Sequence, residues 1–381
     1  MPATPPKFLL VVNDIAWFWS HRLPLAKDIM REGWDLHLAT NNAGENTQIK
    51  ELGITGHNLP RHTGSLNPLN QIKLGWRIFK ILRRVKPEIV HAITLRHAFF
   101  TGIAAHLART PRAVFTLAGL GPLFSSENPK IKIIRFFIVP LFRIAFGGAG
   151  RFVIFQNPDD ARAMISCGAV KRERSIVIRG SGVDMNQFPF IPEPLNDVPV
   201  VLFPSRLLRA KGIGEFVHAV RILASKRIAA RFQVAGDIWP GNHDSVTRTE
   251  LENWKDENMI EWLGHTHDMP AVMAAANIVT LPSYYGEGVP KVLLEAAATG
   301  RAIVTTDMPG CREAVEDGIT GLLIEPKDAW ALADALEKLI HDRDRRIGMG
   351  RAGHARIEAD FTVEKVNEAT IGVYKVLMAS S

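Results

Sequence analysis

Two glutamates, Glu287 and Glu295, flank a short segment whose residue types suit the binding of a phosphorylated ligand. The apolar run 277–282 before them predicts a buried strand, and the run of helix formers 292–298 after Pro290 predicts a helix. Glu287 then lies in the connecting loop, and Glu295 about five residues into the helix, roughly 7–8 Å along its axis. The start of a helix offers free N–H groups to phosphate, and the carboxylates can bind sugar hydroxyls.

A purely structural role is the alternative for this pair. Lys291 and Glu295 are four residues apart and could form an ion pair on a helix surface, worth on the order of a few tenths of a kcal/mol. Glu295, however, is surrounded by leucine and alanine, a composition typical of a core, where a carboxylate needs a partner or a function. The residue types therefore favour a ligand-binding role over a purely structural one.

A second charged segment follows the apolar run 198–203. Arg206 and Lys211 come directly after this predicted strand, where a planar guanidinium and a point charge can bind a diphosphate. A solvated basic loop is the alternative for this segment alone. Cations at one strand end and carboxylates at a nearby strand end together describe a pocket for a nucleotide sugar, which favours the binding role.

The bulk composition limits the class of protein. The chain has 381 residues, which predicts two domains, and 46% hydrophobic residues, which supports ordinary globular cores. Its two cysteines, Cys167 and Cys311, are too few for a disulfide framework and favour a reducing compartment. We expect neither a secretory signal nor a membrane-spanning helix, because the apolar runs are too short.

The net charge of +7 hides an asymmetry between the two halves of the chain. Residues 1–190 contain 25 Lys and Arg against 12 Asp and Glu, or +13, whereas the remainder contains 21 against 27, or −6. This asymmetry predicts that only the first half meets an anionic surface or acceptor. Nucleic-acid binding would explain the basic half but not the carboxylate pair, so no nucleic-acid partner is expected.

Apolar strand-like runs alternate with helical runs throughout the chain, a pattern typical of buried parallel strands. The fold class expected is α/β, with two doubly wound Rossmann-like parallel-sheet domains that face each other across a cleft. The Pro-rich connector 187–194 divides a first domain, 1–187, from a second, 188–361, and a C-terminal helix at 362–381 is expected to pack back on the first. The predicted strands are 8–12, 35–39, 88–92, 113–117, 198–203, 231–235, 259–263, 278–281 and 302–306.

These segments resemble the donor-site signature of retaining glycosyltransferase family 4, whose members have the GT-B fold. The likeness rests on Arg206 with Lys211-Gly212 and on the Glu287/Glu295 pair, covers nearly the whole chain and is densest over 178–325. Shorter motifs extend it at 180–184, Gly236-Asp237, Leu263-Gly264-His265, Leu281-Pro282-Ser283 and 309–313.

The resemblance implies a role for each matching residue. Arg206 and Lys211 would hold the donor diphosphate and stabilise the leaving group, and Glu287 would contact the donor sugar. Glu295 would bind the ribose hydroxyls, and backbone N–H groups would meet the phosphate or the sugar. The donor-binding positions expected are Glu295, Gly288, Val289, Gly236 and Pro290.

The resemblance also implies that no catalytic metal is needed, because the cations and the helix start replace it. Asp342-Arg343-Asp344 lies in a charged helical run and is interpreted as surface. His265-Thr266-His267-Asp268 could ligate a metal, but it falls where the family has a plain loop. We therefore expect no cofactor. The nucleoside-diphosphate sugar is consumed in the reaction and counts as a substrate.

The first domain would carry the acceptor site. Where many family members have a His, this chain has 116–121, Thr-Leu-Ala-Gly-Leu-Gly. Same-face substitution can retain the configuration without a protein base, because the departing phosphate oxygen takes the acceptor proton. Together with 91–96, this segment resembles the branch that acts on polyprenyl-diphosphate-linked sugars, and His91 and His97 are interpreted as structural. The acceptor-binding residues expected are Arg22, Thr94, Arg96, Gly119 and Gly121.

Two segments suggest contact with a membrane. Residues 130–146 are strongly apolar with interspersed cations, which suits a membrane interface; a helix packed into the core with its cations reaching solvent is the alternative. Trp17-Phe18-Trp19 is a second candidate, expected in an exposed loop. With the basic first half, these segments predict peripheral attachment to an anionic inner leaflet on the cytoplasmic side.

The sequence thus predicts a retaining glycosyltransferase that moves a sugar from a nucleoside diphosphate, by similarity UDP-N-acetylhexosamine, to a lipid-linked saccharide in surface polysaccharide or glycan assembly. Two alternatives stay open: a nucleotide-sugar epimerase on the same plan, and a non-catalytic nucleotide-sugar-binding protein at a membrane. A Rossmann dehydrogenase is disfavoured, because 13–17 contains no Gly-x-Gly-x-x-Gly after the first strand.

Overall fold

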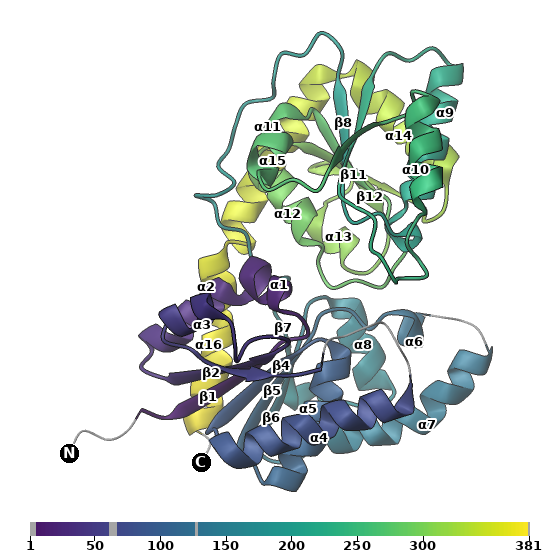
Figure 1. Cartoon of the computed structure of the whole chain (residues 1–381). Coiled ribbons are helices and arrows are strands. Elements are labelled where there is room, and N and C mark those ends of the chain that lie inside the picture. The colour runs from purple at the N-terminus through teal and green to yellow at the C-terminus, as the bar shows by residue number, and fades with distance from the viewer. Residues whose placement is uncertain (1–4, 61–66, 126–128, 380–381) are drawn as a thin grey trace. The chain divides into compact units, whose positions relative to one another are not determined.

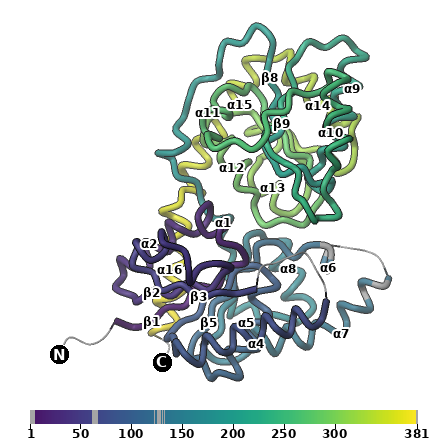
Figure 2. The backbone as a smooth tube through the Cα atoms, viewed as in Figure 1, coloured from purple at the N-terminus to yellow at the C-terminus, as the bar shows by residue number. Residues whose placement is uncertain are grey.

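The computed structural model describes residues 5–60, 67–125 and 129–379. They form two compact units, each built around a parallel sheet (Figures 1 and 2). The first unit comprises the chain up to Ser181 together with the chain from Glu364 onward, and the second comprises Gly182–Val363. The expectation of two doubly wound α/β domains is therefore confirmed.

The sheet of the first unit has seven strands in the order β3-β2-β1-β4-β5-β6-β7, and neighbouring strands run parallel. The chain order reverses between β1 and β4, which makes this the position where open α/β sheets bind ligands. The strands are β1 (Lys7–Val11), β2 (Asp35–Thr40), β3 (Thr55–Asn58), β4 (Ile89–Ile93), β5 (Arg112–Leu117), β6 (Arg151–Phe155) and β7 (Ser175–Val177).

Helices cover both faces of this sheet. Successive residues of a strand point to opposite sides, and here both sides carry apolar residues that need to be buried. Leu9 and Val11 of β1 belong to one apolar cluster, and Phe8 and Leu10 belong to another. The first face is covered by α4 (Pro68–Val85), α5 (Leu95–Ala108), α7 (Pro129–Phe146) and α8 (Pro158–Ser166), of which α4, α5 and α7 lie side by side in Figure 1. The second is covered by α2 (Leu23–Arg31), α3 (Thr47–Glu51) and α16 (Val363–Ala379).

The C-terminal helix α16 packs on the first sheet. Tyr374 is 2% exposed, and its hydroxyl lies 2.7 Å from Nδ1 of His91 in β4. Asn367 donates from Nδ2 to Asp28 Oδ2 in α2 over 2.6 Å. These contacts join the end of the chain to the first unit.

The segment that follows β1 differs from its expected structure. Trp17-Phe18-Trp19 does not form an exposed loop, because it lies in α1 (Ile15–Trp17) and in the short π-helix η1 (Phe18–Arg22). Asp14 caps the start, accepting a hydrogen bond from the N–H of Ala16 over 2.8 Å. Phe18 is fully buried and both tryptophans are half-buried, so the prediction of an exposed aromatic loop is wrong. The free energy gained by burying large aromatic surfaces accounts for the difference.

Helix α7 divides its apolar side chains between the core and the surface. Phe142 and Phe146 are buried against α5 and the sheet, which matches the packed-helix alternative for part of the segment. Phe136 and Phe137, however, are 75% and 70% exposed, and Ile133, Ile134, Leu141 and Ile144 are exposed as well. None of the described helices is long and apolar enough to cross a membrane.

The sheet of the second unit has six strands in the order β10-β9-β8-β11-β12-β13, and its chain order reverses between β8 and β11. The strands are β8 (Val200–Pro204), β9 (Arg231–Ala235), β10 (Glu261–Gly264), β11 (Ile278–Leu281), β12 (Ala302–Thr306) and β13 (Gly321–Ile324). The helices include α9 (Ile213–Ser225), α10 (Arg248–Asp256), α11 (Met269–Ala275), α12 (Lys291–Ala298), α13 (Cys311–Ala314), α14 (Ala329–His341) and α15 (Arg343–Asp360).

Candidate active site

Three of the predicted donor-site residues, Arg206, Lys211 and Glu287, lie in two neighbouring loops of the second unit. Arg206 follows β8, and Lys211 ends the short 3-10 helix η3 (Arg209–Lys211) just before α9. Glu287 lies in the loop between β11 and α12. Because β8 and β11 are adjacent at the point where the chain order reverses, both loops leave the carboxyl edge of the sheet side by side.

Lys211 and Glu287 form an ion pair across these loops. Lys211 Nζ contacts Glu287 Oε2, and the two side chains are only 12% and 13% exposed. The hydroxyl of Ser283 lies 2.6 Å from Glu287 Oε1, to which it donates, and so orients the carboxylate. The structure therefore brings together a cation and an acid that sequence reasoning assigned to one site from positions 76 residues apart.

Two glycines allow the loops to approach this closely. Gly212 has φ +84°, and a Cβ atom there would lie 2.2 Å from the carbonyl oxygen of Pro282. A Cβ atom on Gly236 would lie 1.9 Å from the carbonyl oxygen of Ser205. Larger residues would force apart the loops that carry Arg206, Lys211 and Glu287. Gly236 is thus a supporting position for the site, and its contact is between backbones.

Arg206 is oriented by an aromatic ring. Its guanidinium carbon lies 4.2 Å from the ring centroid of Trp239, a residue that the sequence did not single out. Burial lowers the pKa of Arg206, while the nearby Glu287 and Tyr285 oppose that change. An arginine retains its charge under such a shift, so Arg206 adds a second cation beside Glu287.

Glu295 lies at the fifth position of α12, as the spacing predicts. Pro290 is the N-cap of this helix rather than a residue of its first turn, and Gly288 and Val289 are buried just before it. The Glu295 side chain is 13% exposed, and its Oε1 lies 3.4 Å from Lys291 Nζ. Burial raises the pKa of this carboxyl, and Lys291 acts in the opposite direction. The ion pair weighed as an alternative is present, but it lies largely inside the protein.

The two possible metal-binding segments have other surroundings. Asp342 caps α15, accepting a hydrogen bond from the N–H of Arg345 over 2.9 Å. The rings of His265 and His267 lie 4.9 Å apart in a tilted arrangement. Over residues 5–60, 67–125 and 129–379, no group of three or more His, Cys, Asp or Glu side chains is arranged to hold a metal ion.

Arg22, one of the residues expected to bind the acceptor, is buried. It ends η1 in the first unit, it is 5% exposed, and its Nε has no hydrogen-bond partner among the described residues. Burial lowers the pKa of Arg22 to about 10, and Tyr374 opposes the shift. A buried guanidinium with an unsatisfied donor is unfavourable unless a polar or anionic group reaches it.

Thr94 and Arg96 lie at the carboxyl end of β4, beside β1, where the chain order of the first sheet reverses. Thr94 has φ +78°, a strained conformation for a residue with a Cβ atom, and its N–H donates to the carbonyl of Thr116 over 2.9 Å. Arg96 donates from Nε to Gln71 Oε1 of α4 over 2.7 Å. Strain held in this way is typical of functional sites.

The two nearby histidines have structural roles. His91 is fully buried, with Nδ1 2.7 Å from the hydroxyl of Tyr374 and Nε2 2.7 Å from that of Thr116. Burial lowers the pKa of His91 to about 3, with Arg22 contributing, so the ring is neutral. His97 is also buried and lies 3.2 Å from the Thr94 hydroxyl. These contacts match the structural interpretation of both residues.

The loop with Gly119 and Gly121 lies between β5 and α6 (Pro122–Ser125) and is held by a buried carboxyl group. Asp160, in the first turn of α8, accepts a hydrogen bond from the N–H of Leu120 and another from Asn157 Nδ2 over 3.0 Å. Burial raises the pKa of Asp160 to about 7 despite these bonds. This residue was not identified from the sequence, because its partner lies 40 residues away.

The stability of the first unit should depend on pH through Asp160. Its pKa in the folded protein, about 7, lies above the ordinary value of 3.8, so the native state binds more protons between these values. Stability should fall as pH rises through this window and should level off above about pH 7. Asp160→Asn, which keeps an acceptor oxygen, should match the wild type near pH 4 and be more stable at pH 8, by on the order of 4 kcal/mol. A difference in melting temperature between the variant and the wild type that stays the same at every pH would contradict this prediction.

Two family models match the chain. The model of the group 1 glycosyl transferases matches residues 198–342, and the glycosyl transferase 4-like model matches residues 7–157. The chain therefore belongs to the family-4-like glycosyltransferases, with one model on each unit. The resemblance inferred from Arg206, Lys211, Glu287 and Glu295 is confirmed at the level of the family.

Curated relatives match the chain over most of their length. It is 26% identical to N,N'-diacetylbacillosaminyl-diphospho-undecaprenol alpha-1,3-N-acetylgalactosaminyltransferase of Campylobacter jejuni, over 88% of this chain and 90% of that protein. It is 23% identical to UDP-Gal:alpha-D-GlcNAc-diphosphoundecaprenol alpha-1,3-galactosyltransferase of Escherichia coli, over 82% of this chain and 81% of that protein. Both relatives are transferases, which does not favour the epimerase alternative.

A solved structure shares the fold. HepE of Anabaena in complex with UDP-glucose matches 97% of this chain with 100% of its own, at a TM-score of 0.74 and 22% identity. A likeness at this identity shows the fold alone, and it confirms the GT-B fold class expected from the sequence.

Proposed function

We propose that this glycosyltransferase moves a sugar, with retention of configuration, from a uridine diphosphate donor to a lipid-linked saccharide in the assembly of a surface polysaccharide. The observation that carries the proposal is the convergence of Arg206 and Lys211 on Glu287, where the chain order of the second sheet reverses. Two cations beside an acid match a ligand that carries a diphosphate and sugar hydroxyls together.

The donor would bind by exchange of partners. Lys211, which contacts Glu287 in the structure, would bind the diphosphate instead, and Glu287 would bind the hydroxyls of the sugar. Glu295 would accept hydrogen bonds from the ribose hydroxyls, and the first N–H groups of α12 would meet the phosphate. The complex of HepE with UDP-glucose and the UDP-Gal donor named for the Escherichia coli relative support a UDP-sugar. The N-acetylgalactosaminyl group named for the Campylobacter jejuni relative supports an N-acetylhexosamine, which is the sugar that we propose.

The chemical step follows from these charges. The acceptor oxygen would form a bond with the anomeric carbon as the bond from that carbon to the phosphate oxygen breaks. The departing phosphate oxygen would take the acceptor proton on the same face, so no side-chain base is required. Arg206 and Lys211 would stabilise the negative charge that develops on the leaving diphosphate.

The reaction should proceed without a metal ion, because Arg206, Lys211 and the start of α12 supply the positive charge that a cation would otherwise supply. Treatment of the enzyme with EDTA should therefore leave turnover within about twofold of the untreated rate. A loss of activity that added Mg²⁺ or Mn²⁺ restores would contradict this proposal.

The acceptor would bind the first unit. The two curated relatives named above act on saccharides linked to undecaprenyl diphosphate, and a lipid-linked saccharide is the acceptor class that we propose here. The buried and unsatisfied Nε of Arg22, the strained Thr94 and the positioned Arg96 support a binding role at the carboxyl ends of β1 and β4. Gly119 and Gly121, in the loop held by Asp160, would lie along the acceptor.

A lipid-linked acceptor also implies contact with a membrane on the cytoplasmic side. The exposed Phe136 and Phe137 of α7 and the charge of +13 over residues 1–190 support binding of the first unit to an anionic leaflet. The protein should float with anionic vesicles at moderate salt, and Phe136→Ser with Phe137→Ser should weaken the binding. Leu195→Ser, which changes an 82% exposed residue of the second unit, is the control. Absence of wild-type binding to such vesicles would end this part of the proposal.

A product assay separates transfer from the rival activities. Nucleotide sugars are first screened by thermal shift, because a ligand that binds the folded state raises its melting temperature. The donor that stabilises the protein is then incubated with and without a lipid-linked saccharide. If the protein is a transferase, a new glycoside and free UDP should form when the acceptor is present and should not form without it. An altered sugar nucleotide without acceptor would indicate an epimerase, and binding without any product would indicate a non-catalytic protein.

A further inference from the structure

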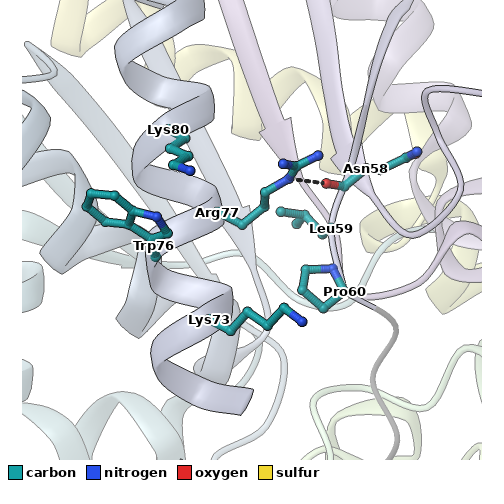
Figure 3. A pocket seen from close by; sticks show the side chains of 7 residues that line it. All are labelled: Asn58, Leu59, Pro60, Lys73, Trp76, Arg77 and Lys80. Carbon is teal, nitrogen blue, oxygen red and sulfur yellow. Dashed lines mark hydrogen bonds between the residues drawn. The ribbon is translucent and has the colours of Figure 1, made fainter. Parts of the chain in front are cut away.

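The first unit contains a cavity that the donor and acceptor residues do not use. Lys73, Trp76, Arg77 and Lys80 of α4 line it on one side, and Asn58–Pro60, which begin at the last residue of β3, line it on the other (Figure 3). Its volume is about 370 Å³. An adjoining hollow of about 230 Å³ shares Asn58, Arg77 and Lys80 and extends to His57 and Arg84. In Figure 3, Lys73 and Arg77 extend from α4 toward the Asn58–Pro60 segment.

The lining is strongly cationic. Lys73, Arg77, Lys80 and Arg84 recur along one side of α4, and neither hollow has an acidic lining residue among the described positions. Two of these cations contact neutral groups: Arg77 Nε donates to the Asn58 carbonyl over 3.2 Å, and Lys80 Nζ lies 5.3 Å from the Trp76 ring centroid. Within the described part of the chain, none of the four cations forms an ion pair. Four such charges around two adjoining hollows favour an anionic ligand.

Arg84 is held in place by a relay of hydrogen bonds. Its Nη2 lies 2.6 Å from His57 Nδ1, and His57 Nε2 lies 2.9 Å from His37 Nδ1. Arginine can only donate, so His57 Nδ1 accepts and His57 Nε2 carries the proton given to His37. Burial lowers the pKa of His57 to about 4, with His37, Arg84 and Arg77 contributing, so its ring is neutral. The wall of the cavity is therefore built from oriented groups and not from loose lysines alone.

An apolar stripe lies next to the cations on the same helix. Leu69, Ile72 and Trp76 follow one another at intervals of three and four residues and are 73%, 66% and 56% exposed. Exposed apolar side chains in a row, beside a basic cavity, match a ligand with an anionic head and a hydrocarbon chain. A free inorganic anion would leave this stripe uncovered.

We propose that the α4 cavity binds the phosphate head group of a lipid, with Lys73, Arg77 and Lys80 on the phosphate oxygens and the hydrocarbon chain along Leu69, Ile72 and Trp76. The choice of a lipid rests on the proposed function. Two lipids share this chemistry: the diphosphate of a lipid-linked acceptor, and an anionic phospholipid of the bilayer. In both cases α4 would position the first unit at the membrane surface, apart from the residues that contact the reacting sugars.

Binding measurements on one triple variant test the site. Lys73→Gln, Arg77→Gln and Lys80→Gln are combined in the full chain, and the control combines Lys50→Gln, Lys171→Gln and Arg172→Gln, which removes the same charge from exposed positions elsewhere in the unit. Calorimetry with farnesyl diphosphate is the first arm, and flotation with phosphatidylglycerol vesicles, against phosphatidylcholine vesicles, is the second. Saturating UDP is present throughout, so that the donor site is occupied.

The cavity variant should bind at least one probe about tenfold or more weakly than the wild type, and the control variant should stay within about twofold. A loss with farnesyl diphosphate assigns the site to the acceptor diphosphate, and a loss with the vesicles alone assigns it to bilayer phospholipid. Wild-type binding of both probes by the cavity variant would overturn the site. UDP affinity, measured in the same variants, should not change; a wild-type protein that fails to bind UDP would instead overturn the proposed function.

Discussion

Lys211→Ala is expected to lower kcat at least about a hundredfold while the protein stays folded. Lys211 contacts Glu287 and is only 12% exposed, so water competes little for its charge. A hundredfold loss equals about 2.7 kcal/mol of transition-state stabilisation, the scale found when one charge-stabilising donor is removed. Because the lost interaction strengthens as the diphosphate departs, kcat should fall more than KM for the donor rises.

Lys226→Ala is the matched control for this measurement. Lys226 also pairs with two carboxylates of the second unit, Asp334 and Glu337, but it does so on the surface. The kcat of the Lys226→Ala variant should remain within about twofold of the wild type, because surface ion pairs contribute little to stability. Circular dichroism establishes that each variant is folded. A folded Lys211→Ala enzyme with a near-normal kcat would contradict the assignment of Lys211 to the leaving group.

Glu295→Ala is expected to lower kcat/KM at least about a hundredfold, because the enzyme would bind the nucleoside more weakly. The carboxylate is 13% exposed and would accept two hydrogen bonds from the ribose, each worth about 1.5–3 kcal/mol as a bond to a charged group. Glu252→Ala is the control, since Glu252 is an exposed glutamate of α10 that lies 3.8 Å from Arg248. That variant should keep the wild-type rate.

A donor that lacks the ribose 2′-hydroxyl tests the same contact from the ligand side. The wild-type enzyme should lose about tenfold or more in kcat/KM with the 2′-deoxy donor, and Glu295→Ala should lose much less, because its partner for that hydroxyl is already gone. Equal losses in the two enzymes would contradict the ribose role. Near-normal rates in both Lys211→Ala and Glu295→Ala would overturn the site as a whole.

The fold was predictable wherever strands are buried on both faces. Runs such as 278–281 and 302–306 contain only apolar residues and threonine, and the structure has strands with the same bounds. The edge strand β3 was missed, because Thr55–Asn58 is short and mostly polar. The strand β6 was also missed, although 151–155 contains the same kind of apolar run as its neighbours.

The convergence of the candidate donor-site residues was predictable because the signal in the sequence is local. Arg206 and Lys211 follow one strand and Glu287 follows another, and strand ends of a parallel sheet meet at one edge. Ser283 and Trp239, which orient Glu287 and Arg206, were not identified as site residues, since a serine or a tryptophan in a loop has no distinctive spacing. Only the folded loops reveal what these side chains contact.

The features that depend on distant segments were beyond the sequence. The aromatic run at Trp17–Trp19 was expected on the surface, because composition cannot tell whether a core lies beneath an aromatic side chain. The hydrogen bond between His91 and Tyr374 joins residues 283 positions apart. The α4 cavity likewise exists because Asn58–Pro60 lie beside α4, and the sequence does not show which segment lies beside that helix.

We propose that Arg206, Lys211, Glu287 and Glu295 bind one nucleoside-diphosphate sugar in the second unit. A structure of the protein with a UDP-sugar is the decisive experiment. We expect diphosphate oxygens about 3 Å from the side-chain nitrogens of Arg206 and Lys211, ribose hydroxyls at the same distance from Glu295, and the sugar at Glu287. A nucleotide bound elsewhere, with Lys211 and Glu287 still paired to each other, would contradict it.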